Sequence, residues 1–449
     1  MSVPERRFLV GNGVLITMEE KNRFIPDGAV LVRGEAVEAV GTTSELRAKH
    51  PDVEFLDAKG MLILPGLVCA HSHLYGQWVR GAPLKGEAPA NWKQILERLW
   101  WKIDKALSPE DNYWQSAAGI VEAIRYGVTT LFDHHASPHS CPGSLDQVAR
   151  AFTELGIRGC LAYEVSDRDG PQIARQGLEE NRRFIERCRK EDNPLLRGIF
   201  GLHASLTLSD QTLRAAAEMG RSLGVGFHVH VAEDRADLEE TGRRYGKHPV
   251  KRLADLGILG ADSIAAHCVH LGPAEIEILR DTGCTVAHNP QSNMNNAVGI
   301  SPVPDMLGVG VNVALGGDGF WYDLFREFNL VPILARLGKG DPRVMGGEEL
   351  RRLVWVNNAR LCAHYWPRPL GQITEGGYAD LILVDYQPFT PLDESNFMSH
   401  LAYAVSGAMV DTTIVGGKVL MRGRELRGID AERIFARSRE LARALWERY

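Results

Sequence analysis

Two histidines one residue apart end the apolar stretch LPGLVCAHSH, which covers residues 64–73. Residues i and i+2 of a β-strand point to the same side, so His71 and His73 can converge on one point. Converging imidazoles suit a transition metal such as zinc. A single His-x-His also occurs by chance, as polar residues that end a strand and bind water or backbone. The rest of the chain must decide between these two interpretations.

Three other apolar stretches end in histidine or carboxylate side chains. GFHVHVAED puts His228 and His230 on one side of a strand, with His230 nearer its end and Glu233 just beyond it. AAHCVHL ends a strand at His267, and VALGGDGF ends one at Asp318. Three or four protein ligands with a position left for water are typical of a catalytic divalent metal. The metal site predicted from this pattern consists of His71, His73, His230 and Asp318.

A metal held by these side chains would lower the pKa of a bound water and supply hydroxide near neutral pH. A carboxylate beside the metal can take that proton and return it. Glu233 and Asp318 are the natural pair for this work. His267 can either orient the hydroxide or polarise the substrate.

The elements that must position these residues alternate between strand and helix. Eight apolar strand candidates are separated by amphipathic patterns, and nearly all of them end in a polar or ionisable residue. One helix is predicted in detail, with Ser108 as N-cap, Pro109 at its first position and Gly127 just past its end. Eightfold alternation predicts an α/β fold of the (β/α)8 TIM-like barrel type, whose active site lies at the C-terminal ends of the strands.

The sequence pattern at both ends of the chain differs from the alternation of strands and helices in the centre. The first sixty residues and segments such as ADLILVDY near the other end are β-rich and carry glycine turns. They predict a small β-sandwich domain built from both termini, with a terminal helix over residues 430–449. The predicted boundaries are 1–63 and 366–449 for this domain and 64–365 for the barrel.

Bulk composition excludes several classes of protein. The formal net charge of −6 provides no general attraction for nucleic acid, and no apolar run reaches the roughly 18 residues that span a bilayer. Seven scattered cysteines without a C-x-x-C motif predict a reducing, cytoplasmic location.

Several motifs together resemble one known family. PGLVCAHSH, HVHVAE, AAHCVHL, HNPQSNMNNAVGISPV, LGGDG and GQITEGGYADLILVD occur in this order over essentially the whole chain. The chain resembles the amidohydrolase superfamily, in the branch of cytosine-deaminase-like and triazine-hydrolase-like enzymes. LWWKIDKAL, FDHHASP and YEVSDRDGP look most like the aminohydrolase group called SsnA within that branch.

The resemblance implies a role for each residue that matches a family motif. Asp318 would take the proton of the metal-activated water, Glu233 would pass protons to the leaving group, and His267 would contact the water or the substrate. His203 matches a position that faces the substrate, although the aromatic residue that usually follows is missing. Binuclear relatives need a bridging ligand, often a modified lysine, at the end of the fourth strand. GLHAS has no lysine there, so one metal is expected. Zinc is the first choice, with Fe²⁺, Mn²⁺ and Ni²⁺ as alternatives.

Other side chains are candidates for substrate contact. Gln77 lies in the loop after His73, Glu164 ends the third strand, and His134 belongs to a doublet with His135 that departs from the commoner deaminase pattern. Substrate contact or a structural role is favoured over metal ligation for the doublet. A cluster of tryptophans after the first strand suggests either an aromatic wall for a planar ring or core packing, with core packing favoured for most of them. Its members are Trp78, Trp92, Trp100 and Trp101.

The predicted function is that of a metal-dependent aminohydrolase, a deaminase in which metal-activated hydroxide displaces ammonia from a purine, pterin or pyrimidine-like ring. The alternative is a chlorohydrolase or cyclic-amide hydrolase with the same site, because pocket contacts select the leaving group. A non-catalytic barrel is disfavoured because the full set of ligands and Glu233 is present. The expected partner is a small heterocyclic substrate, without nucleic acid or membrane. A homodimer is suggested by large enzymes of this type.

Overall fold

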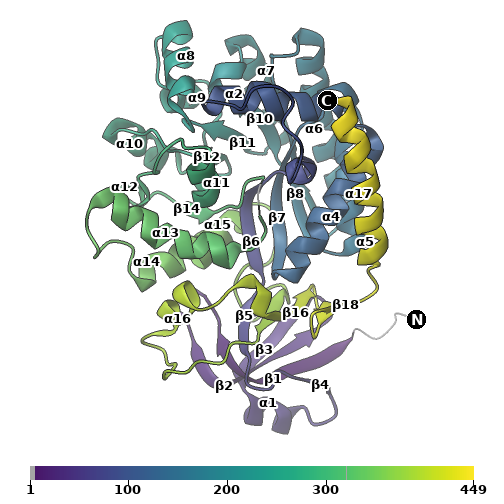
Figure 1. Cartoon of the computed structure of the whole chain (residues 1–449). Helices are drawn as coiled ribbons and strands as arrows, with labels where there is room; N and C mark the ends of the chain where they lie inside the picture. The colour runs from purple at the N-terminus through teal and green to yellow at the C-terminus, as the bar shows by residue number, and fades with distance from the viewer. Residues whose placement is uncertain (1–5, 320) are drawn as a thin grey trace.

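The computed structural model describes residues 6–319 and 321–449. Figure 1 shows two parts: strands enclosed by helices, and a smaller β-rich part whose strands come from residues 7–65 and 381–426. Helix α17 (Ala431–Arg448) returns from the β-rich part and lies along α4 (Pro109–Arg125). The terminal helix predicted over residues 430–449 is thereby confirmed.

The β-rich part is one nine-stranded sheet to which both ends of the chain contribute. Its order is β18-β17-β16-β15-β5-β1-β2-β3, and β4 pairs with β1. The strands are β1 (Arg7–Ile16), β2 (Phe24–Arg33), β3 (Ala36–Thr42), β4 (Glu54–Asp57), β5 (Leu62–Pro65), β15 (Leu381–Val384), β16 (Val410–Val415), β17 (Lys418–Arg422) and β18 (Glu425–Leu426). In β5, Leu64 and Pro65 pair with Ile382 and Leu381 of β15.

The central strands are all parallel and form two sheets, in the orders β6-β7-β8-β9 and β10-β11-β12-β13-β14. They are β6 (Leu67–Ser72), β7 (Val128–His135), β8 (Arg158–Tyr163), β9 (Leu196–Gly198), β10 (Phe200–Ala204), β11 (Phe227–Val231), β12 (Ile264–His267), β13 (Thr285–His288) and β14 (Val313–Leu315). Isolated parallel bridges join the sheets at both junctions, Val165 with Leu202 and Ser72 with Asp318. The alternation of strand and helix read from the sequence is thus present, with the fourth predicted strand divided into β9 and β10.

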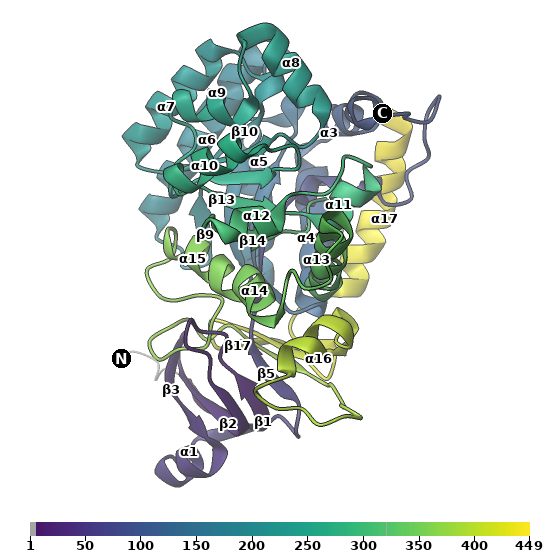
Figure 2. The same cartoon turned by 90° about the vertical axis from the view of Figure 1, so that its left-hand side faces the viewer.

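Helices cover the outside of the parallel strands in both views (Figures 1 and 2). In the central part they are α4, α5 (Ser144–Leu155), α6 (Pro171–Glu191), α7 (Asp210–Leu223), α8 (Arg235–Tyr245), α9 (Pro249–Asp255), α10 (Pro273–Thr282), α11 (Pro290–Asn295), α12 (Val303–Gly308), α13 (Leu324–Lys339), α14 (Gly347–Arg351) and α15 (Asn357–Ala363). The β-rich part carries α1 (Thr43–Lys49) and α16 (Phe397–Tyr403). No helix in the described ranges is long and apolar enough to cross a membrane.

Helix α4 begins where its sequence predicts. Ser108 accepts a hydrogen bond from the Asp111 N–H, and the Asp111 side chain accepts one from the Ser108 N–H. These reciprocal bonds satisfy two backbone donors that the first turn leaves free. Pro109 occupies the first helical position and Gly127 follows the end with φ of 78°. The predicted start and stop of this helix are confirmed.

Small residues occupy inward positions of the parallel strands. Ala70, Ala162, Ala266 and Ala287 belong to one buried cluster, which Trp366 closes on the side of the β-rich part. Small side chains leave room between the strands for the imidazoles that follow them along the chain. The larger apolar side chains of the opposite strand faces pack instead against the surrounding helices.

A buried ion pair joins the two parts of the chain. Arg158 of β8 donates from Nε and Nη2 to the two carboxylate oxygens of Asp380, at 2.9 and 3.1 Å. Neither side chain is more than 2% exposed. The two-point geometry fixes the last segment of the chain against the parallel strands.

Candidate functional site

Side chains from three strand ends meet at one point. His71 and His73 end β6, His230 lies in β11, and Asp318 follows β14. Asp318 Oδ1 lies 3.1 Å from the Nε2 atoms of both His71 and His73, and His230 Nε2 lies 3.1 Å from that of His73. All four are buried. The structure therefore brings together the complete set of predicted metal ligands.

In His73 and His230 the other ring nitrogen, Nδ1, is hydrogen-bonded to a backbone carbonyl. His73 Nδ1 donates to the carbonyl of His134 at 2.6 Å, and His230 Nδ1 donates to the carbonyl of His203 at 2.9 Å. A carbonyl only accepts, so both Nδ1 atoms carry a proton, and in its neutral form each ring would present a bare Nε2 lone pair to the other. Two lone pairs at 3.1 Å repel unless a cation or a proton lies between them. The residues thus fit a divalent metal bound by three nitrogens and one oxygen.

Burial and the Asp318 carboxylate set the charges of this group. Burial lowers the pKa of His71 to about 3. At His73 burial also opposes the charge, but the hydrogen bond to Asp318 outweighs it and raises the pKa to about 9. Burial alone would raise the pKa of Asp318, yet its contacts with the His71 and His73 rings hold it well below its ordinary value. Asp318 is therefore an anion, the form in which a carboxylate can bind a metal.

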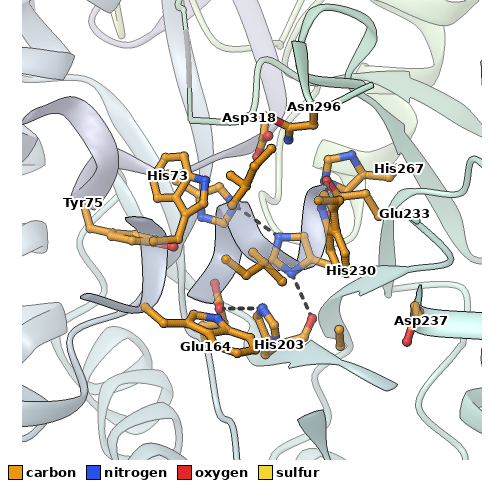
Figure 3. A pocket seen from close by; sticks show the side chains of 16 residues that line it. His73, Tyr75, Glu164, His203, His230, Glu233, Asp237, His267, Asn296 and Asp318 are labelled. Carbon is orange, nitrogen blue, oxygen red and sulfur yellow. Dashed lines mark hydrogen bonds and ion pairs between the residues drawn. The ribbon is translucent and has the colours of Figure 1, made fainter. Parts of the chain in front are cut away.

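Glu233 and His267 stand beside these ligands in the same cavity (Figure 3). His267 Nε2 lies 3.6 Å from Glu233 Oε2, and His267 Nδ1 lies 2.8 Å from Asn293 Oδ1. Burial raises the pKa of Glu233. A carboxyl group whose pKa is raised in this way can carry a proton at a pH closer to neutrality.

Two of these residues have an unusual backbone. His267 has φ of 72° and Asp318 has φ of 54°, in the left-handed region that β-branched and bulky residues avoid. Such conformations cost on the order of 1–3 kcal/mol each and cluster at functional sites. At the ends of β12 and β14 they turn the side chains toward the common cavity.

The cavity is walled by aromatic residues on one helical segment. Trp92 lies in α2 (Trp92–Ile95), Trp100 in η2 (Leu96–Trp100) and Trp101 in α3 (Trp101–Ala106). The cavity is also lined by His73, His230, Glu233, His267 and Asp318. Its remaining lining residues are Tyr75, Ile95, Leu96, Glu164, His203, Ala204, Asp237 and Asn296. A planar ring can lie against such a wall, whereas the fourth tryptophan of the sequence cluster, Trp78, packs against α17.

Glu164 and His203 lie next to each other, on the side of the cavity away from Glu233 (Figure 3). His203 Nε2 lies 3.4 Å from Glu164 Oε1, and His203 Nδ1 contacts Thr207 Oγ1 at 2.6 Å. Burial raises the pKa of Glu164 to about 7. Its other oxygen, Oε2, has no hydrogen-bond partner among the described residues. A buried acceptor without a partner is suited to bind a donor on a substrate.

Two predicted substrate contacts lie elsewhere. Gln77 sits in the turn η1 (Leu74–Val79) and donates to Tyr322 Oη at 3.0 Å and to the His73 carbonyl at 3.3 Å, outside the cavity. The turn after His73 rotates its side chain away. His134 is fully buried, and it offers a ring nitrogen within 4.8 Å of ligand atoms of His71, His73 and His230. His135 points to the opposite side and contacts Ser137 Oγ at 2.9 Å.

Several functional residues were missed by the sequence reasoning or received no role there. Ser292 donates to Asp318 Oδ2, Asn293 holds His267, and Asn296 lines the cavity. The polar run HNPQSNMNN after β13 was the available signal. His228 Nε2 lies 2.7 Å from His71 Nδ1. Its spacing from His230 had placed it on the inner face without indicating a partner.

Comparison with known proteins identifies the relatives of this chain. The amidohydrolase family model matches residues 62–420, and a model of an imidazolonepropionase-like composite domain of bacteria matches residues 28–52. A 5-methylthioadenosine/S-adenosylhomocysteine deaminase of Moorella thermoacetica is 34% identical over 92% of this chain and 94% of that one. A 5'-deoxyadenosine deaminase of Methanosarcina mazei is 32% identical over 97% of this chain and 98% of that one.

Solved structures share the fold over nearly the whole length. A zinc-bound adenosine deaminase from Xanthomonas campestris superposes with a TM-score of 0.87 at 24% identity, covering 99% of both chains. The zinc complex of atrazine chlorohydrolase TrzN from Arthrobacter aurescens superposes with a TM-score of 0.82 at 23% identity, covering 97% of this chain and 100% of that one. The family model and the full-length relatives lead to one conclusion: this chain belongs to the amidohydrolase family.

Proposed function

We propose that this protein is a metal-dependent aminohydrolase that releases ammonia from a nitrogen heterocycle. One observation carries the proposal: ligand atoms of His71, His73, His230 and Asp318 lie close together beside Glu233 and His267, in a cavity walled by aromatic side chains. The relatives that are at least 30% identical over nearly the whole chain are named as deaminases of adenine nucleosides, which supports this reaction class.

His71, His73, His230 and Asp318 would hold one divalent ion, most naturally zinc. Imidazole and carboxylate donors suit zinc, and the two solved relatives above contain it. When bound, such an ion polarises water and lowers its pKa toward neutrality. In this chain Asp318 keeps its second oxygen, Oδ2, turned to the Ser292 hydroxyl. Asp318 would help to hold the ion and take the proton of the activated water, with its carboxylate oriented by Ser292.

Glu233 would carry that proton to the leaving group. The overall reaction adds water to a ring carbon and breaks the bond from that carbon to its exocyclic nitrogen, which leaves as ammonia. A protonated Glu233 is suited to donate to this nitrogen, since burial raises its pKa. His267, held by Asn293, would polarise the reacting carbon or orient the water.

Substrate recognition is assigned to the opposite side of the cavity. The ring would stack against Trp101, whose indole faces His203 with centroids 6.1 Å apart. Glu164 Oε2 would accept a ring N–H, which is a contact that favours a purine or pterin-like base.

We also propose that the two parallel sheets close into one (β/α)8 barrel and that the nine-stranded sheet folds into a β-sandwich. The isolated bridges at both sheet junctions support the barrel. A cluster in which Val10 and Val32 meet Leu381 and Ile414 supports the sandwich. Domain limits near residues 65 and 366, a homodimer and a cytoplasmic location remain predictions. Seven free, buried cysteines are in keeping with the last of these.

An ammonia-release assay tests the proposal. Zinc-loaded protein is incubated with adenine nucleosides, free purines, pterins, pyrimidines and aminotriazines, and zinc-stripped protein is the control. Ammonia from at least one class, only in the loaded protein, is expected. Release of chloride or opening of a cyclic amide, without ammonia from any compound, would replace this function by the alternative hydrolase.

A further inference from the structure

The three histidines of the candidate metal site differ in what holds their Nδ1 atoms. His73 and His230 use backbone carbonyls, whereas His71 Nδ1 lies 2.7 Å from the Nε2 atom of another side chain, His228. His71 and His228 are completely buried. The orientation of His71 therefore depends on a side chain that can be replaced without altering the backbone.

We propose that His228 is a positioning residue for His71: it accepts the Nδ1–H of His71 and so leaves the Nε2 lone pair of His71 free for the ion. The inference rests on the metal centre of the proposed function. A ring that ligates through Nε2 must carry its proton on Nδ1, and an acceptor for that proton fixes both the tautomer and the plane of the ring. Among the described residues no carbonyl takes this role for His71, and the imidazole of His228 supplies it.

This direction of the bond leaves one ring nitrogen of His228 unpaired. If His228 Nε2 accepts, its own proton lies on Nδ1, and that atom has no partner among the described residues. Buried donors without partners are unfavourable and uncommon in proteins. An apolar side chain would fill this position between the strands without that cost. A histidine at this position supplies an acceptor that an apolar side chain would lack.

A second histidine holds the plane of His228. The rings of His134 and His228 are stacked, with centroids 4.5 Å apart and planes 7° from parallel. Neither His134 nitrogen has a hydrogen-bond partner in the described structure, and Nδ1 lies 3.8 Å from Glu164 Oε2. His134 comes from β7 and His228 from β11, two strands of different sheets. The stack thus fixes the acceptor that fixes His71.

His228→Gln and His228→Met separate this role from packing. Gln places an amide oxygen near the position of Nε2, while Met has a similar length but a much weaker acceptor. Zinc affinity is measured by competition with a chelator, and the absorption spectrum of the cobalt-substituted protein reports ligand geometry. The thermal midpoint with and without zinc reports folding separately from metal binding. His135→Met is the matched control, since it removes a buried histidine from β7 that faces away from the ligands.

We expect His228→Met to bind zinc about 10- to 100-fold more weakly, with an altered cobalt spectrum and a smaller zinc-induced rise in the thermal midpoint. His228→Gln should regain most of the affinity, and His135→Met should match the parent. Equal zinc affinity and equal spectra for His228→Met and the parent would overturn the inference, as would a His228→Gln protein no better than His228→Met. A parent protein that binds no metal would instead remove the proposed metal centre itself.

Discussion

Glu233 Oε2 and His267 Nε2 lie 3.6 Å apart, although His267 Nδ1 directs its proton to Asn293. A neutral His267 therefore presents a lone pair to the carboxyl group. A lone pair and a carboxylate repel, so a proton on one of them stabilises the arrangement. Burial raises the pKa of Glu233 and favours its protonated form. This contact places an acid beside the candidate metal ligands.

Glu233→Gln should lower kcat by about 10²- to 10⁴-fold, the range for loss of a general acid–base group. The substitution keeps the shape of the side chain and removes its proton transfer. Zinc content, measured by elemental analysis, should stay at the parental level because Glu233 is not one of the proposed ligands. Parental kcat in a zinc-loaded Glu233→Gln protein would exclude it as the proton carrier.

Asp318→Asn should abolish both tight metal binding and activity. The change removes the only anionic member of the ligand set, whose Oδ1 lies 3.1 Å from two imidazoles. Equilibrium dialysis against zinc measures the loss, and the bound metal of the Glu233→Gln protein is the comparison. Retention of one tightly bound zinc per chain in Asp318→Asn would contradict the ligand set.

Glu164→Gln should reduce kcat/KM by roughly 10- to 100-fold for substrates with a ring N–H, as expected for loss of a hydrogen bond to a charged group. A substrate of the same ring system with that nitrogen methylated should lose much less. Steady-state kinetics on the two compounds make the comparison. Equal losses for both would show that Glu164 does not recognise this donor.

Asp380→Ala should destabilise the fold by about 3–5 kcal/mol because it leaves the buried Arg158 guanidinium without its partner. The free energy of unfolding in denaturant measures the change. The double variant Arg158→Met, Asp380→Leu should recover much of the loss, since it removes both charges together. A loss below about 1 kcal/mol in Asp380→Ala would mean that water or another group replaces the carboxylate.

Glu327→Gln should flatten the dependence of stability on pH. Glu327 is buried in α13 and accepts the Gln291 N–H at 3.0 Å, and burial raises its pKa from 4.5 to about 8. The folded protein therefore holds this proton more tightly than the unfolded chain, and stability falls as pH rises from about 4.5 to 8. The slope from this one group approaches about 1.4 kcal/mol per pH unit within that window.

Denaturant unfolding at pH 5, 6, 7 and 8 compares the parent with Glu327→Gln. The difference in stability between the two should grow in favour of the variant as pH rises. Parallel curves would indicate that Glu327 is ionised in the folded protein throughout.

Patterns among residues close together in the chain were sufficient to predict the helices and strands and the four candidate metal ligands. Apolar runs that end in histidine or aspartate placed His71, His73, His230 and Asp318 at strand ends, because alternation along a strand fixes which side chains share a face. Ser108 and Gly127 likewise marked the ends of α4 through local hydrogen bonds and backbone freedom. Information of this kind is carried by residues only a few positions apart.

Contacts between distant segments could not be read in this way. Gln77 follows His73 closely in the chain, yet a turn directs it to Tyr322, 245 positions away. His134 and His228 look like strand-end residues of separate motifs, yet they stack in the interior. The residues of this sequence specify which chemistry is available, since side-chain type and spacing are local properties. Which of those residues meet depends on how the parallel strands are arranged relative to one another, and that is a property of the folded chain.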